Sequence, residues 1–189
     1  MKSYLHITST GFDPERGKPI KDPYLGDQPS LGACMPNIRR RVVPGDYIFT
    51  LSGKIPEAQQ LVVGGLEVAE KISALAAFKR FPEQRLHMTD GQVTGNIIVD
   101  SRGRQHPLDH HDHETSANRV KNYIVGRNAI ALTTRREIHR GRTETLYVLQ
   151  QLLRKSGDSP IQVMGRWCKL DERQTREIID WLLEIKAGH

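Results

Sequence analysis

Three consecutive arginines, Arg39 to Arg41, follow a short segment that carries the thiol of Cys34 and the ring of Pro36. The planar guanidinium group binds phosphate oxygens and guanine edges through paired hydrogen bonds. If this segment is extended, neighbouring side chains point to opposite sides, and Arg40 then faces away from the other two. We therefore expect Arg39 and Arg41 to bind an anion, with a solvated turn as the alternative.

Cys34 is one of two cysteines, and the other is Cys168 beside Trp167. Nearby cations lower the pKa of a thiol and make it a better nucleophile, whereas small buried cysteines commonly serve packing alone. No histidine is adjacent to Cys34 in the sequence. A packing role and a reactive role both stay open for Cys34, and we expect packing for Cys168.

Histidines and acids are concentrated in residues 106–114, which read His-Pro-Leu-Asp-His-His-Asp-His-Glu. Imidazole and carboxylate groups are metal ligands, and His110, His111 and His113 are the weak candidates for such a site. Their spacing matches no metal-binding signature such as H-E-x-x-H, so we expect a polar surface loop without metal. A pairing of Asp109 with His111 as catalytic carboxylate and base stays an alternative.

A second concentration of basic residues lies between residues 102 and 142. Its cations are Arg102, Arg104, Arg119, Lys121, Arg127, Arg135, Arg136, Arg140 and Arg142. Tyr123 lies among them, and its ring either stacks on a base, as in single-strand binders, or packs in a strand. Together with a formal net charge of +6, this region favours a polyanionic partner such as nucleic acid or a nucleotide.

Strands and turns place these residues in the first two thirds of the chain. Residues 4–8 alternate apolar and polar side chains, which predicts a strand carrying His6. A Pro-Gly-Asp turn ending at Asp46 leads into a strand over residues 47–52. Residues 61–70 predict its hairpin partner, and their glycines indicate a bulge or the close approach of another backbone. His6 and Asp46 are therefore further candidates for the site.

Further short strands are predicted at residues 95–100, 123–126 and 129–132, and the last third of the chain changes to helical periodicity. Thr143 predicts the start of one helix, and Asp171 followed by Gln174 predicts a capping box at the start of a second. Trp181 is interpreted as buried either within the chain or in a homodimer.

Strands first and helices last indicate an α+β fold, in which C-terminal helices pack on a small curled antiparallel sheet or a barrel. We expect one domain over residues 1–189, mainly β to residue 135 and helical from residue 136. There is no recognisable signal peptide and no apolar run long enough to span a membrane. We therefore expect a cytoplasmic protein with reduced thiols, no membrane partner and no cofactor.

Several blocks of the chain, taken together, resemble the nucleotide-modification-associated domain family of the second type, found in phages and bacteria. The blocks are residues 31–40 with Cys34, Pro36, Ile38 and Arg39, then residues 45–48, 61–63, 68–71, 95–98 and 123–130. They span most of residues 4–150 in the expected order. Before Gly126 the chain has Tyr-Ile-Val in place of the fuller aromatic cluster common in the family.

The resemblance implies an association with enzymes that modify DNA bases. A looser likeness, carried by the Gly-Asp turn at residues 45–46 and the following strands, is to the PUA, EVE and ASCH group. It implies a PUA-like barrel with a cleft for a nucleotide or modified base.

We therefore expect a nucleic-acid-associated protein that binds a nucleotide or modified base in a basic cleft without catalysis. The candidate binding residues are Arg39, Arg41, Cys34, Asp46, Tyr123, Arg127 and His6. The alternative is an enzyme acting on a nucleotide or modified base, either with or without a metal, so whether the chain catalyses a reaction stays open.

Overall fold

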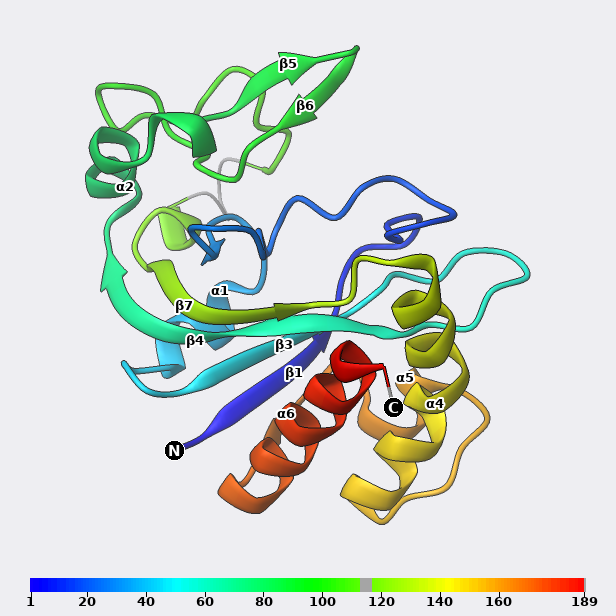
Figure 1. The fold of residues 1–189 in the computed structure, drawn as a ribbon. Coiled ribbons are helices and arrows are strands. Elements are labelled where there is room, and N and C mark those ends of the chain that lie inside the picture. Colours follow the sequence, from blue (N-terminus) through cyan, green and yellow to red (C-terminus); the bar gives the residue numbers. More distant parts are fainter. Residues whose placement is uncertain (113–116, 189) are drawn as a thin grey trace. The chain divides into compact units, whose positions relative to one another are not determined.

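A computed structural model describes residues 1–112 and 117–188 of the chain (Figure 1). The strands are β1 (Ser3–Ile7), β2 (Ser30–Leu31), β3 (Tyr47–Leu51), β4 (Val62–Ile72), β5 (His87–Thr89), β6 (Gln92–Thr94), β7 (Tyr123–Ala131) and β8 (Trp167–Leu170). The helices are α1 (Pro36–Arg41), α2 (Ala74–Arg80), the 3-10 helix η1 (Pro82–Gln84), α4 (Arg135–Leu153), α5 (Pro160–Met164) and α6 (Glu172–Ala187).

The fold is α+β, as predicted. A mixed six-stranded sheet has the order β2-β7-β4-β3-β1-β8, and β5 and β6 form a separate hairpin. Within the described residues, the end strands β2 and β8 each pair with one neighbour only, so the sheet is not closed into a barrel. The wholly antiparallel sheet that we expected differs from this one because β1 and β3 run parallel. Parallel neighbours need a long crossover, and residues 8–46 supply it.

Contacts divide the chain into two compact units. The first comprises residues 1–20, 46–67 and 128–189, and the second comprises residues 21–45 and 68–127. The single domain predicted over residues 1–189 stays a prediction.

In the first unit, the predicted hairpin is confirmed, because β3 and β4 pair antiparallel from Tyr47 opposite Glu67 onward. The pairing shifts register between Thr50 and Leu51, opposite Gly64. A Cβ atom at Gly64 would lie only 2.0 Å from the carbonyl oxygen of Ile130. The glycine therefore marks both the bulge and the close backbone approach that the sequence indicated.

The helix α4 begins earlier than predicted. Its N-cap is Thr134, whose hydroxyl accepts from the Glu137 N–H, while the Glu137 carboxylate accepts from the Thr134 N–H at 3.1 Å. Thr143, the predicted cap, lies inside the helix and donates its hydroxyl to the His139 carbonyl at 3.0 Å. Sequence reasoning missed the glutamate three residues after Thr134, which completes the capping box.

The helix α6 begins at Asp171 as predicted, with both hydrogen bonds of the Asp171–Gln174 capping box present. Trp181 is 9 % exposed, and its indole N–H donates to Glu144 Oε2 at 2.8 Å. Its burial is therefore achieved within the chain. The C-terminal part also contains the strand β8, which pairs antiparallel with β1. No described helix is both long and apolar enough to cross a bilayer.

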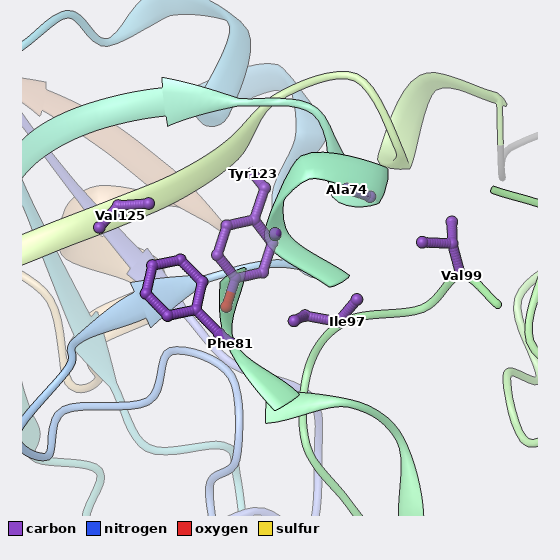
Figure 2. Close-up of a cluster of buried hydrophobic side chains, with 7 residues drawn as sticks. Ala74, Phe81, Ile97, Val99, Tyr123 and Val125 are labelled. Atoms are coloured by element: carbon purple, nitrogen blue, oxygen red, sulfur yellow. The ribbon is translucent and has the colours of Figure 1, made fainter. Parts of the chain in front are cut away.

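In the second unit, Figure 2 shows an apolar cluster in which the rings of Phe81 and Tyr123 stack at a centroid distance of 6.3 Å. The other buried members of this cluster are Ala74, Ala77, Ile97, Val99 and Val125. Residues 95–100 make only isolated bridges, through Ile97 and Val99, rather than the predicted strand. The runs at residues 123–126 and 129–132 form one strand, β7, which ends at Ala131.

Candidate anion-binding site

The arginine block is helical, and this changes which arginine faces solvent. Pro36 occupies the first turn of α1, where its missing N–H costs nothing. Ile38 and Val42, four residues apart, are both fully buried and anchor one side of the segment. Adjacent helical residues point roughly 100° apart. Consequently Arg39 is fully buried while Arg40 is exposed, and the segment does not have the extended conformation that was considered from the sequence.

The Arg39 guanidinium is used entirely inside the second unit. It donates to the carbonyl oxygens of Cys34 at 2.8 Å, Arg119 at 2.9 Å, Asn122 at 2.8 Å and Ala33 at 3.3 Å. Burial lowers the pKa of Arg39 to about 10, so the group stays charged at neutral pH. In this structure Arg39 therefore joins segments of the chain rather than offering a surface contact to phosphate.

A buried carboxylate holds the segment before α1 in place. Asp22 accepts N–H groups from Gly32 at 2.7 Å, from Ala33 at 2.9 Å and from Cys34. Asn96 donates to the same carboxylate at 3.1 Å. Three backbone donors on one side chain fix the path of the chain into α1.

Two candidates from the sequence lie within this interior network. Tyr123 is fully buried and donates its hydroxyl to Asn96 Oδ1 at 2.9 Å, so its ring is a core side chain. Burial, with a further contribution from the Asp22 carboxylate, raises the pKa of the Cys34 thiol above its usual range. These environments favour packing roles for both residues.

A basic pocket lies on the exposed side of α1. Its cavity measures about 320 Å³, and its polar lining consists of Asn37, Arg40, Asn118, Arg119, Lys121 and Asn122. Three of these side chains are cations and three are amides, and within residues 1–112 and 117–188 no carboxylate lines the cavity. Arg40 comes from α1, while Arg119 and Lys121 come from a segment that is distant in the sequence. Since the three cations share one cavity, positive charge is concentrated there.

Arg119 connects this pocket to the interior. Its Nη1 donates to the Ala33 carbonyl oxygen at 2.7 Å, which also accepts from Arg39. The Nε atom of Arg119 is buried and has no hydrogen-bond partner among the described residues. Buried N–H groups nearly always find an acceptor.

The remaining candidates are not brought together at this pocket. His6 is fully buried in β1 of the first unit, and its Nε2 lies 2.8 Å from Thr50 Oγ1. Asp46, also in that unit, is buried and accepts the Lys2 N–H at 2.9 Å. Arg41 and Arg127 are exposed residues of the second unit, and neither lines the pocket.

Residues between Gln105 and Asp112 line a separate cavity, among them His110 and His111 together with the carboxylates of Asp109 and Asp112. His111 Nδ1 lies 2.5 Å from Asp109 Oδ1, the pairing considered from the sequence. His113 lies outside the described residues. Within residues 1–112 and 117–188, no group of three or more His, Cys, Asp or Glu side chains is arranged to hold a metal ion.

Arg119 and Lys121 were recognised as part of a basic region, but the sequence did not predict that they meet Arg40 in one pocket. The proline at the first helical position and the apolar spacing of Ile38 and Val42 were the available signals for a helix over the arginine block. No local signal relates Arg40 to Arg119, because only the tertiary structure brings them to one pocket.

Comparisons with known proteins do not add to this description: no protein-family model matches the chain, and no curated protein or solved structure matches it significantly. Function is therefore inferred from the residues of the site.

Proposed function

We propose that this chain binds nucleic acid, or a nucleotide, through phosphate groups held by Arg40, Arg119 and Lys121. The observation that carries this proposal is the meeting of three cations in a cavity whose described lining includes no carboxylate. The Nε of Arg119 is buried without a hydrogen-bond partner among the described residues, so this donor would gain from an acceptor. A phosphate oxygen supplies both the acceptor and the negative charge, and such charge-assisted bonds are strong.

A nucleotide suits the cavity better than a small inorganic anion. The volume of about 320 Å³ lies within the range of pockets that hold small organic ligands. The amides of Asn37, Asn118 and Asn122 offer both donors and acceptors, which is what base edges require. The net charge of +6 favours approach of a polyanion to the whole protein.

The resemblance to the nucleotide-modification-associated domain family suggests the same class of partner. On that resemblance we extend the proposal to an association with DNA base modification. The likeness to the PUA, EVE and ASCH group stays a prediction. It does not support this proposal, because the sheet is not closed into the implied barrel and the basic pocket lies between α1 and residues 118–122.

Fluorescence polarisation with labelled single-stranded DNA and RNA of one sequence tests the proposal. Affinity of the wild-type chain should fall steeply between about 50 and about 200 mM salt. Arg40→Gln and Lys121→Gln should each weaken binding and lower the salt slope by about one.

Arg135→Gln is the matched control, since Arg135 is exposed on α4 and does not line the pocket, and its substitution removes the same charge. The proposal is wrong if binding is absent or insensitive to salt. It is equally wrong if Arg40→Gln and Lys121→Gln bind as Arg135→Gln does.

The enzymatic alternative keeps one supporting observation. Of its sequence-derived candidates, Cys34, His6 and Asp46 are engaged in the interior. The pair of Asp109 and His111 instead lies at a cavity with the geometry of an oriented base. That pair is the one feature of the described residues that favours catalysis.

A further inference from the structure

The two sides of the basic pocket are joined by hydrogen bonds. From α1, the buried guanidinium of Arg39 donates to the backbone carbonyl oxygens of Arg119 at 2.9 Å and Asn122 at 2.8 Å, and both of these residues line the pocket. In the other direction, Arg119 Nη1 donates at 2.7 Å to the carbonyl oxygen of Ala33, which precedes α1. A ligand therefore meets a cavity that is already assembled, and less binding free energy is lost in ordering it.

The charge of the pocket suits a phosphate group with more than one negative charge. Arg40, Arg119 and Lys121 share the cavity, and no carboxylate is among its described lining residues. A phosphate monoester carries a charge of about −1.5 to −2 near neutral pH and has three free oxygen atoms. A phosphodiester within a strand carries a single charge and has only two free oxygen atoms. Three cations in one cavity therefore gain more from the monoester.

The pocket lacks a feature of the grooves that follow a single strand. Such grooves combine cations along the backbone with aromatic side chains on which successive bases stack. No aromatic side chain is among the described lining residues of the pocket, and Tyr123, which follows Asn122 in the chain, is buried. The pocket is thus better suited to one compact phosphate group than to a run of nucleotides.

Two other arginines of the second unit are paired with carboxylates away from the pocket. Arg80 donates to the two carboxylate oxygens of Glu70 at 2.6 and 3.1 Å. Arg104 donates to Asp100 Oδ2 at 2.9 Å. Neither arginine lines the pocket, and the charge of each is offset by its partner. These arginines therefore do not extend the positive charge of the pocket along the surface.

We propose that the basic pocket recognises the terminal phosphate of a nucleotide, in preference to the phosphodiesters within a strand. This inference rests on the proposed binding function and names the ligand group of the same site. Two sources present this group, namely a free nucleoside phosphate and the phosphorylated end of a strand. The amides of Asn37, Asn118 and Asn122 offer donors and acceptors to the attached sugar or base.

Isothermal titration calorimetry of the full chain with AMP and with 3′,5′-cyclic AMP tests this preference. The two ligands share the sugar and the base, but the phosphate of cyclic AMP is a diester with a single charge. AMP should bind at least about tenfold more tightly, because one additional charge-assisted hydrogen bond contributes roughly that factor. Inorganic phosphate should bind more weakly than AMP, since it leaves the amides of the pocket without a ligand group.

The acidity of the ligand provides a second readout. A phosphate monoester has a second pKa of about 6, so AMP loses part of its charge between about pH 7.5 and about pH 5. The affinity for AMP should fall over this range, whereas that for cyclic AMP should not change. Arginine and lysine side chains stay charged over the same range, and no histidine or carboxylate is among the pocket's described lining residues.

Variants of the pocket locate the preference. Arg40→Gln and Lys121→Gln should each lower the affinity for AMP by about tenfold and that for cyclic AMP by less. Lys79→Gln is the matched control, since Lys79 is an exposed lysine on α2 of the same unit and does not line the pocket. It should bind AMP as the wild type does. Equal affinities of Lys121→Gln and Lys79→Gln for AMP would show that the pocket is not the binding site.

Fluorescence polarisation separates the two sources of the terminal phosphate. The probe is an internally labelled DNA strand with a phosphate at its 5′ end, at its 3′ end or at neither end. A phosphorylated strand that binds more tightly than both AMP and the unphosphorylated strand identifies a strand end as the ligand. AMP that binds as tightly as either phosphorylated strand identifies the free nucleotide. Both results support recognition of a terminal phosphate.

The outcomes also separate this inference from the proposed function. Equal affinities for AMP and cyclic AMP, together with salt-sensitive binding of nucleic acid, would overturn the inference and leave the proposed function intact. Absence of binding to nucleotides and nucleic acids alike would overturn both. Inorganic phosphate that binds as tightly as AMP would overturn the assignment to a nucleotide. If a variant loses its folded circular dichroism spectrum, the wild-type comparison of AMP with cyclic AMP still decides.

Discussion

Arg39 and Arg40 are neighbours in the chain, yet the Arg39 guanidinium is buried on four backbone carbonyl oxygens while Arg40 lines an open basic pocket. The helix α1 separates them, because consecutive helical residues point in different directions. One arginine therefore holds the site together, and the other is available to a ligand. This division of roles can be measured, since loss of stability and loss of binding should separate between the two positions.

Arg39→Lys should destabilise the protein. Lysine keeps the charge but lacks the rigid fork that reaches several carbonyl oxygens at once, so buried acceptors would be left unpaired. We expect the free energy of unfolding to fall by about 3 kcal/mol, measured by urea denaturation. Arg40→Lys, the matched control on the exposed side, should stay within about 0.5 kcal/mol of the wild type. Equal denaturation midpoints for the two variants would show that the interior contacts contribute little.

Local patterns predicted the elements that depend on residues close together in the sequence. Asp171 and Gln174 identified the start of α6 because both capping partners lie three residues apart. The hairpin of β3 and β4 followed from two apolar runs close together in the sequence, residues 47–52 and 61–70, the first of them introduced by a Pro-Gly-Asp turn. Thr134 and Thr143 offer similar caps, and only Glu137 favours the first.

The strand β8 and the basic pocket depend on contacts between segments that are distant in the sequence. The strand β8 is an edge strand of four residues that exists by pairing with β1, more than 150 residues earlier in the chain. The basic pocket likewise joins Arg40 to residues 118–122. No period or motif within either segment points to the other, so the pocket could not be predicted from the sequence.

Neither thiol should react quickly in the folded protein. Burial raises the pKa of Cys34 above its usual range and raises that of Cys168 to about 11. At about pH 8 only roughly one Cys168 thiol in a thousand would be ionised, and the thiolate is the reactive form. Reaction with an aromatic disulfide reagent should be slow in buffer and complete in guanidinium chloride. Rapid labelling of Cys34 in the native protein would instead restore the reactive role considered from the sequence.

Glu137 should make stability depend on acid pH. Burial acts to raise its pKa, but hydrogen bonds from the N–H groups of Thr133 and Thr134, together with Lys186, outweigh this and lower the pKa to about 2. A lowered carboxyl pKa stabilises the folded state above the ordinary value and loses that stabilisation as pH falls through the folded value.

The free energy of unfolding should therefore fall between about pH 4.5 and about pH 2 by more in the wild type than in Glu137→Gln. Urea denaturation across this range measures the difference. Lys186→Gln should show an intermediate dependence, because it removes one contributor and leaves the backbone donors. Parallel pH profiles for the wild type and Glu137→Gln would mean that the charge at this cap contributes nothing.

Asp13 and Arg142 form the most enclosed ion pair of the first unit. Arg142 donates to both carboxylate oxygens at 3.0 and 2.9 Å and to the Gln59 carbonyl oxygen at 2.7 Å. Asp13 also accepts the N–H groups of Glu15 and Arg16 at 3.0 and 2.9 Å. Its side chain is fully buried, so removal of Arg142 leaves a carboxylate without its counter-ion.

Arg142→Gln should lower the free energy of unfolding by about 3 to 5 kcal/mol at neutral pH. Arg16 is an exposed arginine of the loop that carries Asp13. Arg16→Gln should change the free energy of unfolding by less than about 0.5 kcal/mol. Combining Arg142→Gln with Asp13→Asn should recover part of the loss, since the double variant buries no unpaired charge. Additive effects of the two substitutions would show that the pair is not coupled.

The pH dependence of Arg142→Gln provides an independent check of the same pair. Burial acts to raise the pKa of Asp13, but hydrogen bonds from Arg142 and from the N–H groups of Arg16 and Glu15 hold it below its usual value. Stabilisation by Asp13 is therefore present above the ordinary carboxyl pKa and is lost as pH falls through the lowered one. The gap in stability between the wild type and Arg142→Gln should narrow over that acid range. A gap that stays constant would assign the cost of the substitution to lost packing of the arginine rather than to its charge.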